Sequence, residues 1–423
     1  MKVALSVRDF LDRAETVYPD RVAVVDEPDQ PAAPLGDLTY RQLAERARAQ
    51  AAGLDRLGVG PGERVAIVSH NAGRLLSGFW GVSGWGRIYV PINFRLAHEE
   101  IAYIVEHCGA SVLLYDPEVA DVVRGIDVEH RAQLGSADEE ALFDWGSEPA
   151  PWVPDEEATA TINYTSGTTA RPKGVQQTHR SLWINATTFG WQAGVSDRDV
   201  YLHTLPMFHC NGWGMPYANA GMGATQVVLR KVDGAEILRR VDEHGVTLLC
   251  GAPAVVNMVL DAAADLTEVP GAGRTRIVVA GAPPPTRTIE RVETELGWEF
   301  IQIYGLTETA PLLTMNRGRA EWDHLDAAGR AQGAHQGRRA RVAAHVEEEL
   351  VDRRHRRLDV AHVIGIRIEL GELGRFRLRL AQATEHVDQA TFLGLRTAPD
   401  PAARDRVDLV GLAVASGRDL ADE

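Results

Sequence analysis

Short apolar runs separated by amphipathic segments are the feature that most limits what this chain can fold into. RVAIVSH at residues 64–70 and ASVLLYD at residues 110–116 are almost continuously apolar and are bounded by polar residues or glycine. Such runs are typical of strands that are buried on both faces of a sheet. Between residues 40 and 57 apolar side chains recur mostly every three or four positions, which predicts a helix that ends at Gly58. Strands that alternate with helices predict an α/β fold with largely parallel sheets.

A second series of apolar runs follows in the middle of the chain. ATINYTSG at residues 160–167 predicts a strand that continues into a loop. Four further predicted strands are TQVVLR (225–230), VTLLCGAP (246–253), RIVVAGAP (276–283) and EFIQIYG (299–305). AEILRRVDEHG at residues 235–245 predicts a helix with Ile237, Leu238 and Val241 facing inward. Nearly every strand ends in Gly, Pro, Ser or Thr, and ligands of open α/β sheets bind at the carboxyl ends of strands, so we expect the site in these loops.

Charge and cysteine usage narrow the function classes. The net charge of −15 argues against a nucleic-acid partner, because such proteins normally carry a basic face. The three cysteines are far apart, which predicts reduced thiols in a cytoplasmic protein. The N-terminal residues lack the apolar stretch of a signal peptide. The most apolar segment, residues 246–260, is broken by Gly251, Pro253 and Asn257, so no transmembrane segment is predicted.

The stretch YTSGTTARPKG at residues 164–174 has the composition of a phosphate-binding loop. Its threonine and serine hydroxyls belong to Thr165, Ser166, Thr168 and Thr169. Gly167 lets the backbone approach a ligand, and Lys173 adds a positive charge. The order Pro172-Lys173-Gly174 excludes a Walker A loop. A hydroxyl-rich turn by itself is more often a surface loop, so the interpretation depends on other segments.

Three such segments follow in order: TLPMFHCNGWG (204–214), VVAGAPPP (278–285) and QIYGLTETAP (302–311). Together with the hydroxyl-rich loop they resemble the signature motifs of the adenylate-forming family, which includes acyl-CoA synthetases, luciferases and peptide-synthetase adenylation domains. LTYRQLAERA (38–47) and residues 86–116 resemble the family's N-terminal segments, so the resemblance covers about residues 1–316. The HCNGWG variant is most similar to medium- and long-chain fatty acyl-CoA ligases and their methylmercaptopropionate-using relatives.

The resemblance implies a large N-terminal α/β domain, residues 1–316, with a layered αβαβα architecture and two similar sheet-helix subdomains. The family activates a carboxylate by its attack on ATP, which gives acyl-AMP and pyrophosphate, and a thiol then displaces AMP. The implied small molecules are ATP, Mg²⁺, coenzyme A and a fatty or other medium- or long-chain carboxylic acid. A carrier protein in place of coenzyme A stays open as the acceptor, and a homodimer stays open as the oligomeric state.

The resemblance also implies roles for individual residues around the phosphates. The loop from Thr165 to Lys173 would bind the β- and γ-phosphates, with Thr165 close to the metal ion. Thr307 would donate a hydrogen bond to the α-phosphate, and Glu308 would help to hold Mg²⁺. His209 would lie beside the α-phosphate and the acyl carboxylate. The alternatives are a buried, satisfied histidine at His209 and a solvated acid at Glu308.

Further implied contacts concern adenine and the acyl group. Tyr304, with Gln302 and Ile303 in the same region, would lie against adenine. The opposite wall would consist of Gly281, Ala282 and Pro283. Gly305 would leave space near the acyl group. Trp213 matches an aromatic gate of the fatty-acyl tunnel, and the alternative is a plain core residue, as large aromatic side chains usually are.

The last part of the chain departs from the family pattern. From Arg317 onward there is no lysine, tyrosine or asparagine, and the last lysine of the chain is Lys231. The family's ribose-binding aspartate, hinge and late catalytic lysine are not recognisable, nor is its small C-terminal domain. We therefore expect residues 317–423 to be an atypical arginine-rich tail, with a frameshift as one hypothesis for its origin. Impaired catalysis follows as an expectation, and a non-catalytic nucleotide- or acyl-binding remnant is the alternative.

Overall fold

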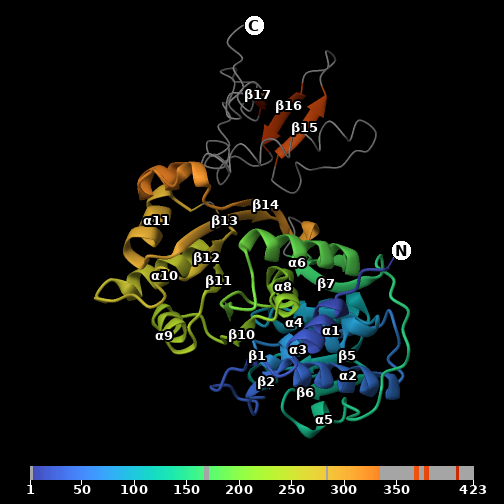
Figure 1. Ribbon diagram of the computed structural model, residues 1–423. Coiled ribbons are helices and arrows are strands. Elements are labelled where there is room, and N and C mark those ends of the chain that lie inside the picture. The colour runs from blue at the N-terminus through green and yellow to red at the C-terminus, as the bar shows by residue number, and fades with distance from the viewer. Residues whose placement is uncertain are drawn as a thin grey trace. The chain divides into compact units, whose positions relative to one another are not determined.

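A computed structural model describes residues 3–165, 171–282 and 284–333, and the backbone of β15 (Ile366–Leu370), β16 (Phe376–Leu380) and β17 (Arg406–Asp408). The chain divides into two compact units, Met1–Arg317 and Gly318–Glu423 (Figure 1). In the second unit, the three strands form an antiparallel sheet in the order β15-β16-β17. The first unit contains two larger sheets, and it carries every described residue of the candidate site.

The first large sheet has six strands in the order β6-β5-β3-β4-β7-β8. Its strands are β3 (Arg64–Val68), β4 (Ile88–Ile92), β5 (Ala110–Tyr115), β6 (His130–Gln133), β7 (Thr159–Thr165) and β8 (Lys173–Thr178). All neighbouring pairs are parallel except β7 and β8, which form an antiparallel hairpin. The strands predicted around residues 64–70, 110–116 and 160–167 are confirmed.

The second large sheet has eight strands in the order β14-β13-β12-β11-β9-β10-β1-β2. Its strands are β1 (Val22–Val25), β2 (Asp37–Thr39), β9 (Val200–His203), β10 (Thr225–Val228), β11 (Leu248–Gly251), β12 (Arg276–Val279), β13 (Glu299–Gly305) and β14 (Leu312–Asn316). The inner pairs are parallel, and the two edge strands β2 and β14 are antiparallel to their neighbours. The four later predicted strands are confirmed as β10 to β13.

The helices cover the faces of the sheets. They are α1 (Arg8–Val17), α2 (Tyr40–Arg56), α3 (Gly73–Gly81), α4 (His98–Cys108), α5 (Ala137–Glu140), α6 (His179–Ala193), α8 (Met215–Met222), α9 (Gly234–His244), α10 (Pro253–Ala263) and α11 (Thr286–Arg291). The predicted helix α2 begins with a capping box between Thr39 and Gln42, and Gly58 follows it with a φ of +78°. The predicted inward residues of α9 are all buried. Among the described residues, no helix has both the length and the apolar character that crossing a membrane requires.

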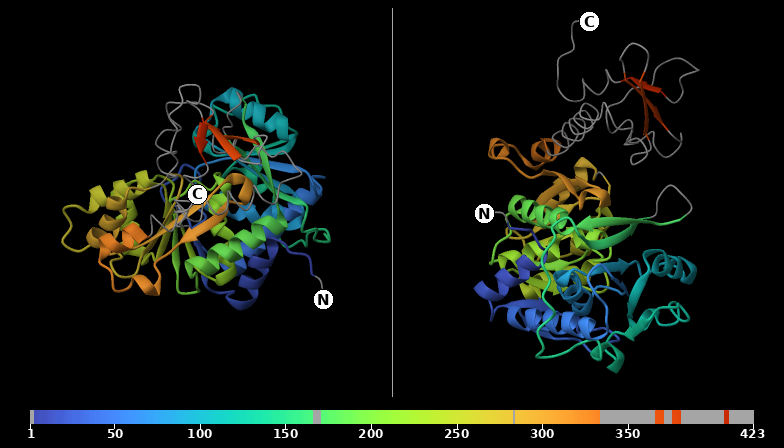
Figure 2. Two further views of the ribbon diagram at one scale, coloured as in Figure 1. Left: turned by 90° about the horizontal axis from the view of Figure 1, so that it is seen from above. Right: turned by 90° about the vertical axis from the view of Figure 1, so that its right-hand side faces the viewer.

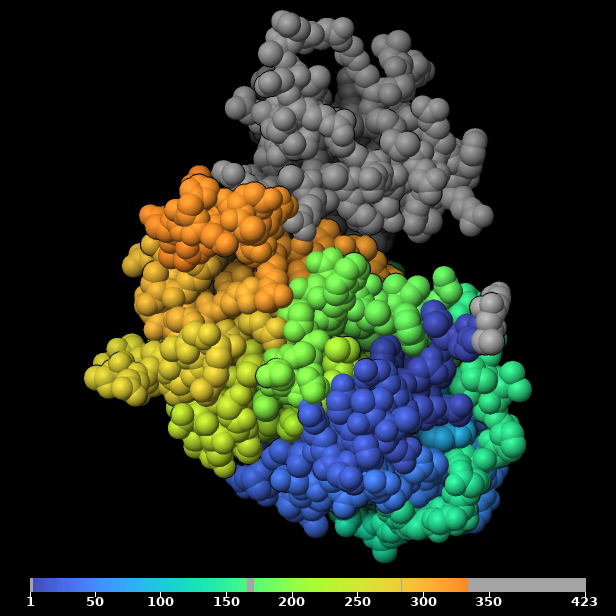
Figure 3. Space-filling model, viewed as in Figure 1, coloured from blue at the N-terminus to red at the C-terminus, as the bar shows by residue number. Residues whose placement is uncertain are grey.

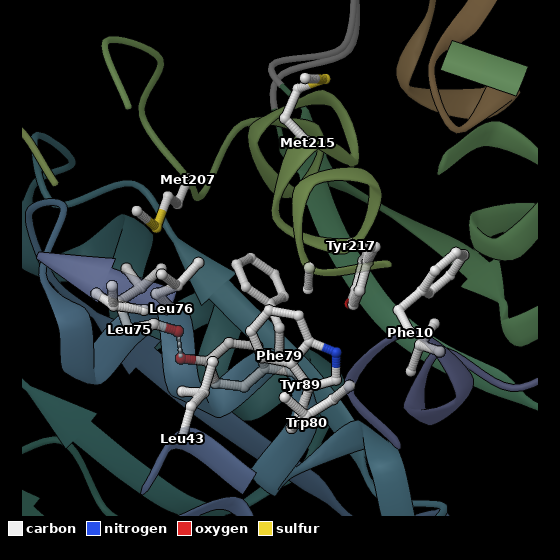
Figure 4. Close-up of a cluster of buried hydrophobic side chains, with 14 of the residues drawn as sticks. Phe10, Leu43, Leu75, Leu76, Phe79, Trp80, Tyr89, Met207, Met215 and Tyr217 are labelled. Atoms are coloured by element: carbon white, nitrogen blue, oxygen red, sulfur yellow. Dashed lines mark hydrogen bonds between the residues drawn. The ribbon is translucent and has the colours of Figure 1, made fainter. Parts of the chain in front are cut away.

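Two clusters of buried apolar side chains show how the layers pack. The larger one fills the space between the sheets, where Ile67 of β3 and Val278 of β12 pack with residues of the helices α2, α3, α6 and α8. Figure 4 shows part of it, with the hydroxyl of Tyr89 donating to the carbonyl of Leu75 at 3.0 Å. A second cluster packs α4 on the outer face of the six-stranded sheet.

These clusters give the order of the layers. α4 lies outside the six-stranded sheet, helices fill the middle, and α9 and α10 cover the outer face of the eight-stranded sheet (Figures 1 and 2). The predicted αβαβα architecture is therefore confirmed. Figure 3 shows α6 beside α1 at the surface, where the rings of Trp183 and Phe10 lie 5.8 Å apart, centroid to centroid.

Candidate active site

The hydroxyl-rich stretch connects the two strands of the β7–β8 hairpin. Thr165, the last residue of β7, pairs with Lys173, the first residue of β8. Both ends of the predicted phosphate loop therefore lie side by side, and Lys173 is exposed there. Ser166, Gly167, Thr168 and Thr169 lie outside the described residues. Within the described part of the chain, no hydrogen bond or ion pair engages the Lys173 ammonium, so it is available to a ligand.

Helix α4 contacts the loop end of the β7–β8 hairpin. The hydroxyl of Tyr164 lies 2.7 Å from Nδ1 of His107, and the guanidinium of Arg171 lies 5.2 Å from the ring centre of Tyr103. Tyr164 and Arg171 lie on the two sides of residues 165–170, so both sides are anchored to one helix.

The segment after His209 is a left-handed turn. Its five residues all have positive φ: Cys210 (48°), Asn211 (52°), Gly212 (57°), Trp213 (61°) and Gly214 (77°). The amide of Gly212 donates to the carbonyl of His209 at 3.0 Å, and that of Gly214 to the carbonyl of Asn211 at 3.1 Å. Each residue with a Cβ costs about 1–2 kcal/mol in this conformation, asparagine less than others. Strain of this kind is concentrated at functional sites, because surrounding contacts must hold it.

His209 itself has an exposed side chain, and no described residue forms a hydrogen bond with its ring. The alternative of a buried, satisfied histidine is therefore wrong. Protein atoms still surround the ring closely enough that burial lowers its pKa below the ordinary value. The ring is neutral near pH 7 and can donate one hydrogen bond and accept another. Trp213, four residues later, is buried at 5% exposure.

Thr307 and Glu308 meet the His209 turn. The sulfur of Cys210 lies 3.0 Å from the hydroxyl oxygen of Thr307, and Nε2 of Gln177 on β8 donates to the Thr307 carbonyl at 2.9 Å. The pKa of the Cys210 thiol is raised to about 11, mainly by burial; the Thr307 hydrogen bond opposes this rise, and the negative charge of Glu308 adds to it. The Glu308 carboxylate is exposed, and in the described ranges no hydrogen bond or salt bridge occupies it.

The two predicted walls of the adenine site end at the same edge of the eight-stranded sheet. Val279 pairs with Gln302, so Gly281 and Tyr304 each follow two residues later. Gly281 has a φ of +92°, which a residue with a Cβ would adopt only with strain. The side chain of Ala282 is exposed and that of Tyr304 is half-buried. Pro283 lies outside the described residues.

Three further predicted residues have packing roles in this structure. Gln302 and Ile303 are buried, and Ile303 belongs to the core between the sheets. Glycine is required at position 305, because a Cβ there would lie 1.7 Å from the carbonyl oxygen of Pro311. The chain therefore returns tightly over Gly305 at Pro311, directly after it presents Glu308.

The available donors fit Mg²⁺. Thr165 offers a hydroxyl and Glu308 a carboxylate, which are the hard oxygen ligands that Mg²⁺ prefers. No group of three or more histidine, cysteine or acidic side chains gathers anywhere in the described residues. The Thr165 hydroxyl and the Glu308 carboxylate suit a metal ion that is held by one or two carboxylates and by the phosphates of a substrate. They do not suit a metal site built entirely from protein ligands.

Sequence reasoning missed three buried polar residues at this site: Asn163 of β7, Gln177 of β8 and Asn211 of the left-handed turn. The dipeptide Asn211-Gly212 is typical of positive φ and could have predicted the turn. The partners of these side chains lie on distant segments, and no local pattern predicts them.

The segments predicted to bind phosphate, adenine and the acyl group follow the carboxyl ends of β7, β9, β12 and β13. A family model described as AMP-binding enzyme matches residues 11–365, and the chain therefore belongs to the AMP-binding enzyme family. The match runs past Asn316, where the resemblance described above ends.

The similar proteins are coenzyme A ligases. The chain is 36% identical over 343 residues to a long-chain-fatty-acid–CoA ligase of Thermus thermophilus, covering 77% of this chain and 61% of that protein. It is 34% identical over 352 residues to a 2-methylpropanoate–CoA ligase of Humulus lupulus, covering 76% and 61%. The chain thus spans about three fifths of the length of these relatives.

Solved structures are similar over about three quarters of the chain. An inhibitor-bound N-terminal domain from Mycobacterium tuberculosis is 29% identical with a TM-score of 0.66, covering 74% of this chain and 79% of that one. A fatty acyl CoA synthetase from the same organism is 28% identical with a TM-score of 0.64, covering 73% and 61%.

Proposed function

We propose that this chain activates an aliphatic carboxylic acid with ATP and transfers the acyl group to coenzyme A. The observation that carries the proposal is the position of Thr307. It is bonded both to Cys210, next to His209, and to Gln177 on the hairpin strand that begins at Lys173. Thr307 thus connects three segments: the hairpin with the predicted phosphate loop, the turn after His209, and the segment that contains the predicted metal ligand Glu308.

The proposed chemistry must overcome repulsion between a carboxylate and a polyphosphate. Lys173 and the hydroxyls of its loop would bind the β- and γ-phosphates. The Thr307 hydroxyl would donate to the α-phosphate, and neutral His209 would donate to an oxygen of the α-phosphate or the attacking carboxylate. Mg²⁺, held by Glu308 and Thr165, would neutralise phosphate charge. Fixed donors of this kind stabilise charge that develops in the transition state.

The substrate class follows from the His209 turn and from the relatives. The turn ends in the buried indole of Trp213, which we assign to the entrance of an acyl site. The similar ligases act on acids that range from 2-methylpropanoate to long-chain fatty acids. We propose a medium- or long-chain aliphatic acid, because an apolar residue at the entrance favours an apolar chain.

We further propose that turnover is slow. No lysine follows Lys231, so the chain offers no late lysine ammonium to the adenylation transition state. Arginine is a poor replacement, because its planar fork differs in geometry and hydration from an ammonium group. Binding of ATP depends on the first unit and is expected to persist.

The test is acyl-adenylate formation by the purified chain. The protein is incubated with ATP, Mg²⁺ and a series of straight-chain acids from acetate to palmitate, and acyl-AMP is detected by mass spectrometry, with and without coenzyme A. The proposal expects adenylate for one range of chain lengths and none with Glu308→Gln. A folded protein that binds ATP but forms no adenylate would instead support the binding remnant.

A further inference from the structure

We propose that Asn211 is a positioning residue that fixes His209 relative to Thr307 and to the phosphate-loop hairpin. This proposal rests on the proposed function, because the geometry that it maintains is that of the adenylation site. Asn211 touches none of the predicted substrate positions, and it acts through its neighbours.

The contacts of Asn211 reach both strands of the hairpin. Its Nδ2 donates to Oγ1 of Thr161 on β7 and to Oε1 of Gln177 on β8, both at 2.8 Å. Its Oδ1 accepts from Nδ2 of Asn163 on β7 at 3.1 Å. Asn211, Thr161, Asn163 and Gln177 are all at most 3% exposed. A buried amide that uses both its N–H donors and its carbonyl oxygen in hydrogen bonds is a rigid connection, and its loss leaves several groups unpaired.

The side-chain amides form a relay of hydrogen bonds in which each amide donates to the next. Asn163 donates to Asn211, Asn211 donates to Gln177, and Gln177 donates to the Thr307 carbonyl. Both ends fix this direction, because Asn163 also donates to the carbonyl of Phe208 and a carbonyl can only accept. None of the three amides can rotate by half a turn without breaking a bond to a backbone carbonyl or to its neighbour.

Other asparagines hold the remainder of the segment around His209. Asn71 donates to the carbonyls of His203 and Leu205 and accepts from the amide of Met207. Asn185 donates to the Trp213 carbonyl and accepts from the amide of Leu312.

The buried side chains of Met207 and Met215 flank the segment (Figure 4). The backbone on both sides of His209 is thus fixed, while the imidazole has no described hydrogen-bond partner. A preorganised site is expected to have such an arrangement, in which the backbone is fixed and the polar side chain has no described protein partner.

Asparagine suits this position for two separate reasons. Its φ of +52° is tolerated by asparagine and glycine better than by other residues. Its amide both donates and accepts, as the relay requires. Aspartate would keep the shape but would place an acceptor against Oε1 of Gln177. Glycine would keep the backbone and remove the amide. These two substitutions therefore separate the role of the side chain from that of the backbone.

The experiment compares wild type, Asn211→Gly and Asn211→Asp, with Asn219→Ala as the control. Asn219 is a buried asparagine of α8 whose Nδ2 donates within its own helix to the carbonyl of Met215 at 2.8 Å. Its loss reports the general cost of removing a buried amide. We expect both Asn211 variants to lower the rate of acyl-AMP formation by about 10- to 100-fold at saturating ATP, because small displacements of reacting groups have effects of this size. Asn219→Ala is expected to stay within about twofold of wild type.

A second readout does not depend on catalysis. This readout is the pKa of His209, to be followed by NMR on histidine-labelled protein and assigned with His209→Gln. Burial by the surrounding protein lowers this pKa below its ordinary value in the wild type. A loosened turn leaves fewer protein atoms around the ring, so the pKa is expected to rise toward the ordinary value in both Asn211 variants and to stay unchanged in Asn219→Ala. A wild type that forms no adenylate would contradict the proposed function, yet the His209 titration would still test positioning. An unchanged His209 pKa in folded Asn211→Gly would overturn the proposal.

Discussion

The sulfur of Cys210 and the hydroxyl oxygen of Thr307 lie 3.0 Å apart, although 97 residues separate them in the sequence. The contact joins the turn that presents His209 to the segment that presents Glu308. These two segments enter the site from different elements, α7 (Cys210–Trp213) and η4 (Thr307–Thr309), and a hydrogen bond fixes their spacing. The site is therefore one assembled unit, and its parts should respond together to substitution.

The cysteine thiols are predicted to be inert in the native protein. Burial raises the pKa of Cys210 and Cys108 to about 11 and that of Cys250 to about 12. At about pH 8 roughly one thiol in a thousand or fewer is then the reactive thiolate. A disulfide reagent should label no cysteine rapidly in native buffer and all three in denaturant. Rapid stoichiometric labelling of Cys210 in the folded protein would contradict this account.

Gly305→Ala should disrupt the site. The new methyl group would lie 1.7 Å from the Pro311 carbonyl oxygen, so the backbone that leads to Glu308 must move. We expect a loss of several kcal/mol in the free energy of unfolding and at least a tenfold weaker affinity for ATP, roughly the effect of displaced binding groups. Gly60→Ala is the control, because the nearest atom to its new methyl group is 3.6 Å away. Equal behaviour of the two variants would show that the close return over Gly305 is not rigid.

Arg230→Ala should destabilise the contact between the two sheets. Arg230 follows β10 and donates to both carboxylate oxygens of Asp116, which follows β5, at 2.8 and 2.9 Å. Burial alone would raise the pKa of Asp116, but hydrogen bonds and the charge of Arg230 outweigh it and hold the pKa below its ordinary value. Removal of one partner leaves a buried carboxylate unpaired, which costs about 3 kcal/mol or more.

The stability lost in Arg230→Ala should depend on pH, and the lowered pKa of Asp116 sets the direction of that dependence. A carboxyl group with a lowered pKa stabilises the fold above its unfolded pKa, near 4, and loses this contribution as the pH falls through its folded pKa. The difference in unfolding free energy between wild type and Arg230→Ala, measured by urea titration, should thus be largest near pH 7 and shrink below about pH 4. Arg124→Ala, which removes an exposed pair with Asp121, should cost about 0–1 kcal/mol. A difference that grows toward low pH would contradict the assignment.

His203 should make the fold sensitive to acid. Its ring is fully buried, and burial lowers its pKa to about 4, with a hydrogen bond to Gln226 opposing that shift. The unfolded chain binds a proton at this residue near pH 6.5 and the folded chain does not until about pH 4. The stabilisation is therefore complete above about pH 6.5 and is lost as the pH falls toward 4, with a slope of at most about 1.4 kcal/mol per pH unit. Unfolding experiments on His203→Gln should show a smaller slope in this window, and an equal slope would refute the prediction.

Much of the fold could be predicted from sequence, because the pattern that specifies it is local. The run RVAIV and the helix with Ile237, Leu238 and Val241 facing inward carry their own periodicity, and the structure confirms both. The motif segments also predicted Thr307 and His209 to be parts of one site, and that assignment stays a prediction. The pairing of β8 with β7 was not predicted, since KGVQQT is polar and its burial is set by distant partners.

The polar interior of the site could not be predicted. Nothing in the sequence marks Asn211, Asn163 and Gln177 as partners. Only the fold brings their side-chain amides together, so that Asn163 donates to Asn211 and Asn211 donates to Gln177. The left-handed conformation of Trp213 is equally hidden, because nothing about tryptophan favours positive φ. Both features depend on contacts between segments that lie far apart along the chain.

The most direct test of the central claim, that the hairpin, the His209 turn and the Thr307–Glu308 segment form one acyl-adenylate site, is a binding measurement. The ligand is a non-hydrolysable acyl sulfamate of adenosine, in which the sulfamate replaces the α-phosphate, and calorimetry follows its titration into the full chain. The account predicts saturable binding at one site, weakened about tenfold or more by Thr307→Val and by His209→Ala, because each substitution removes a hydrogen bond to the sulfamate. A folded chain that fails to bind the ligand, or that binds it equally well in both variants, would contradict the claim.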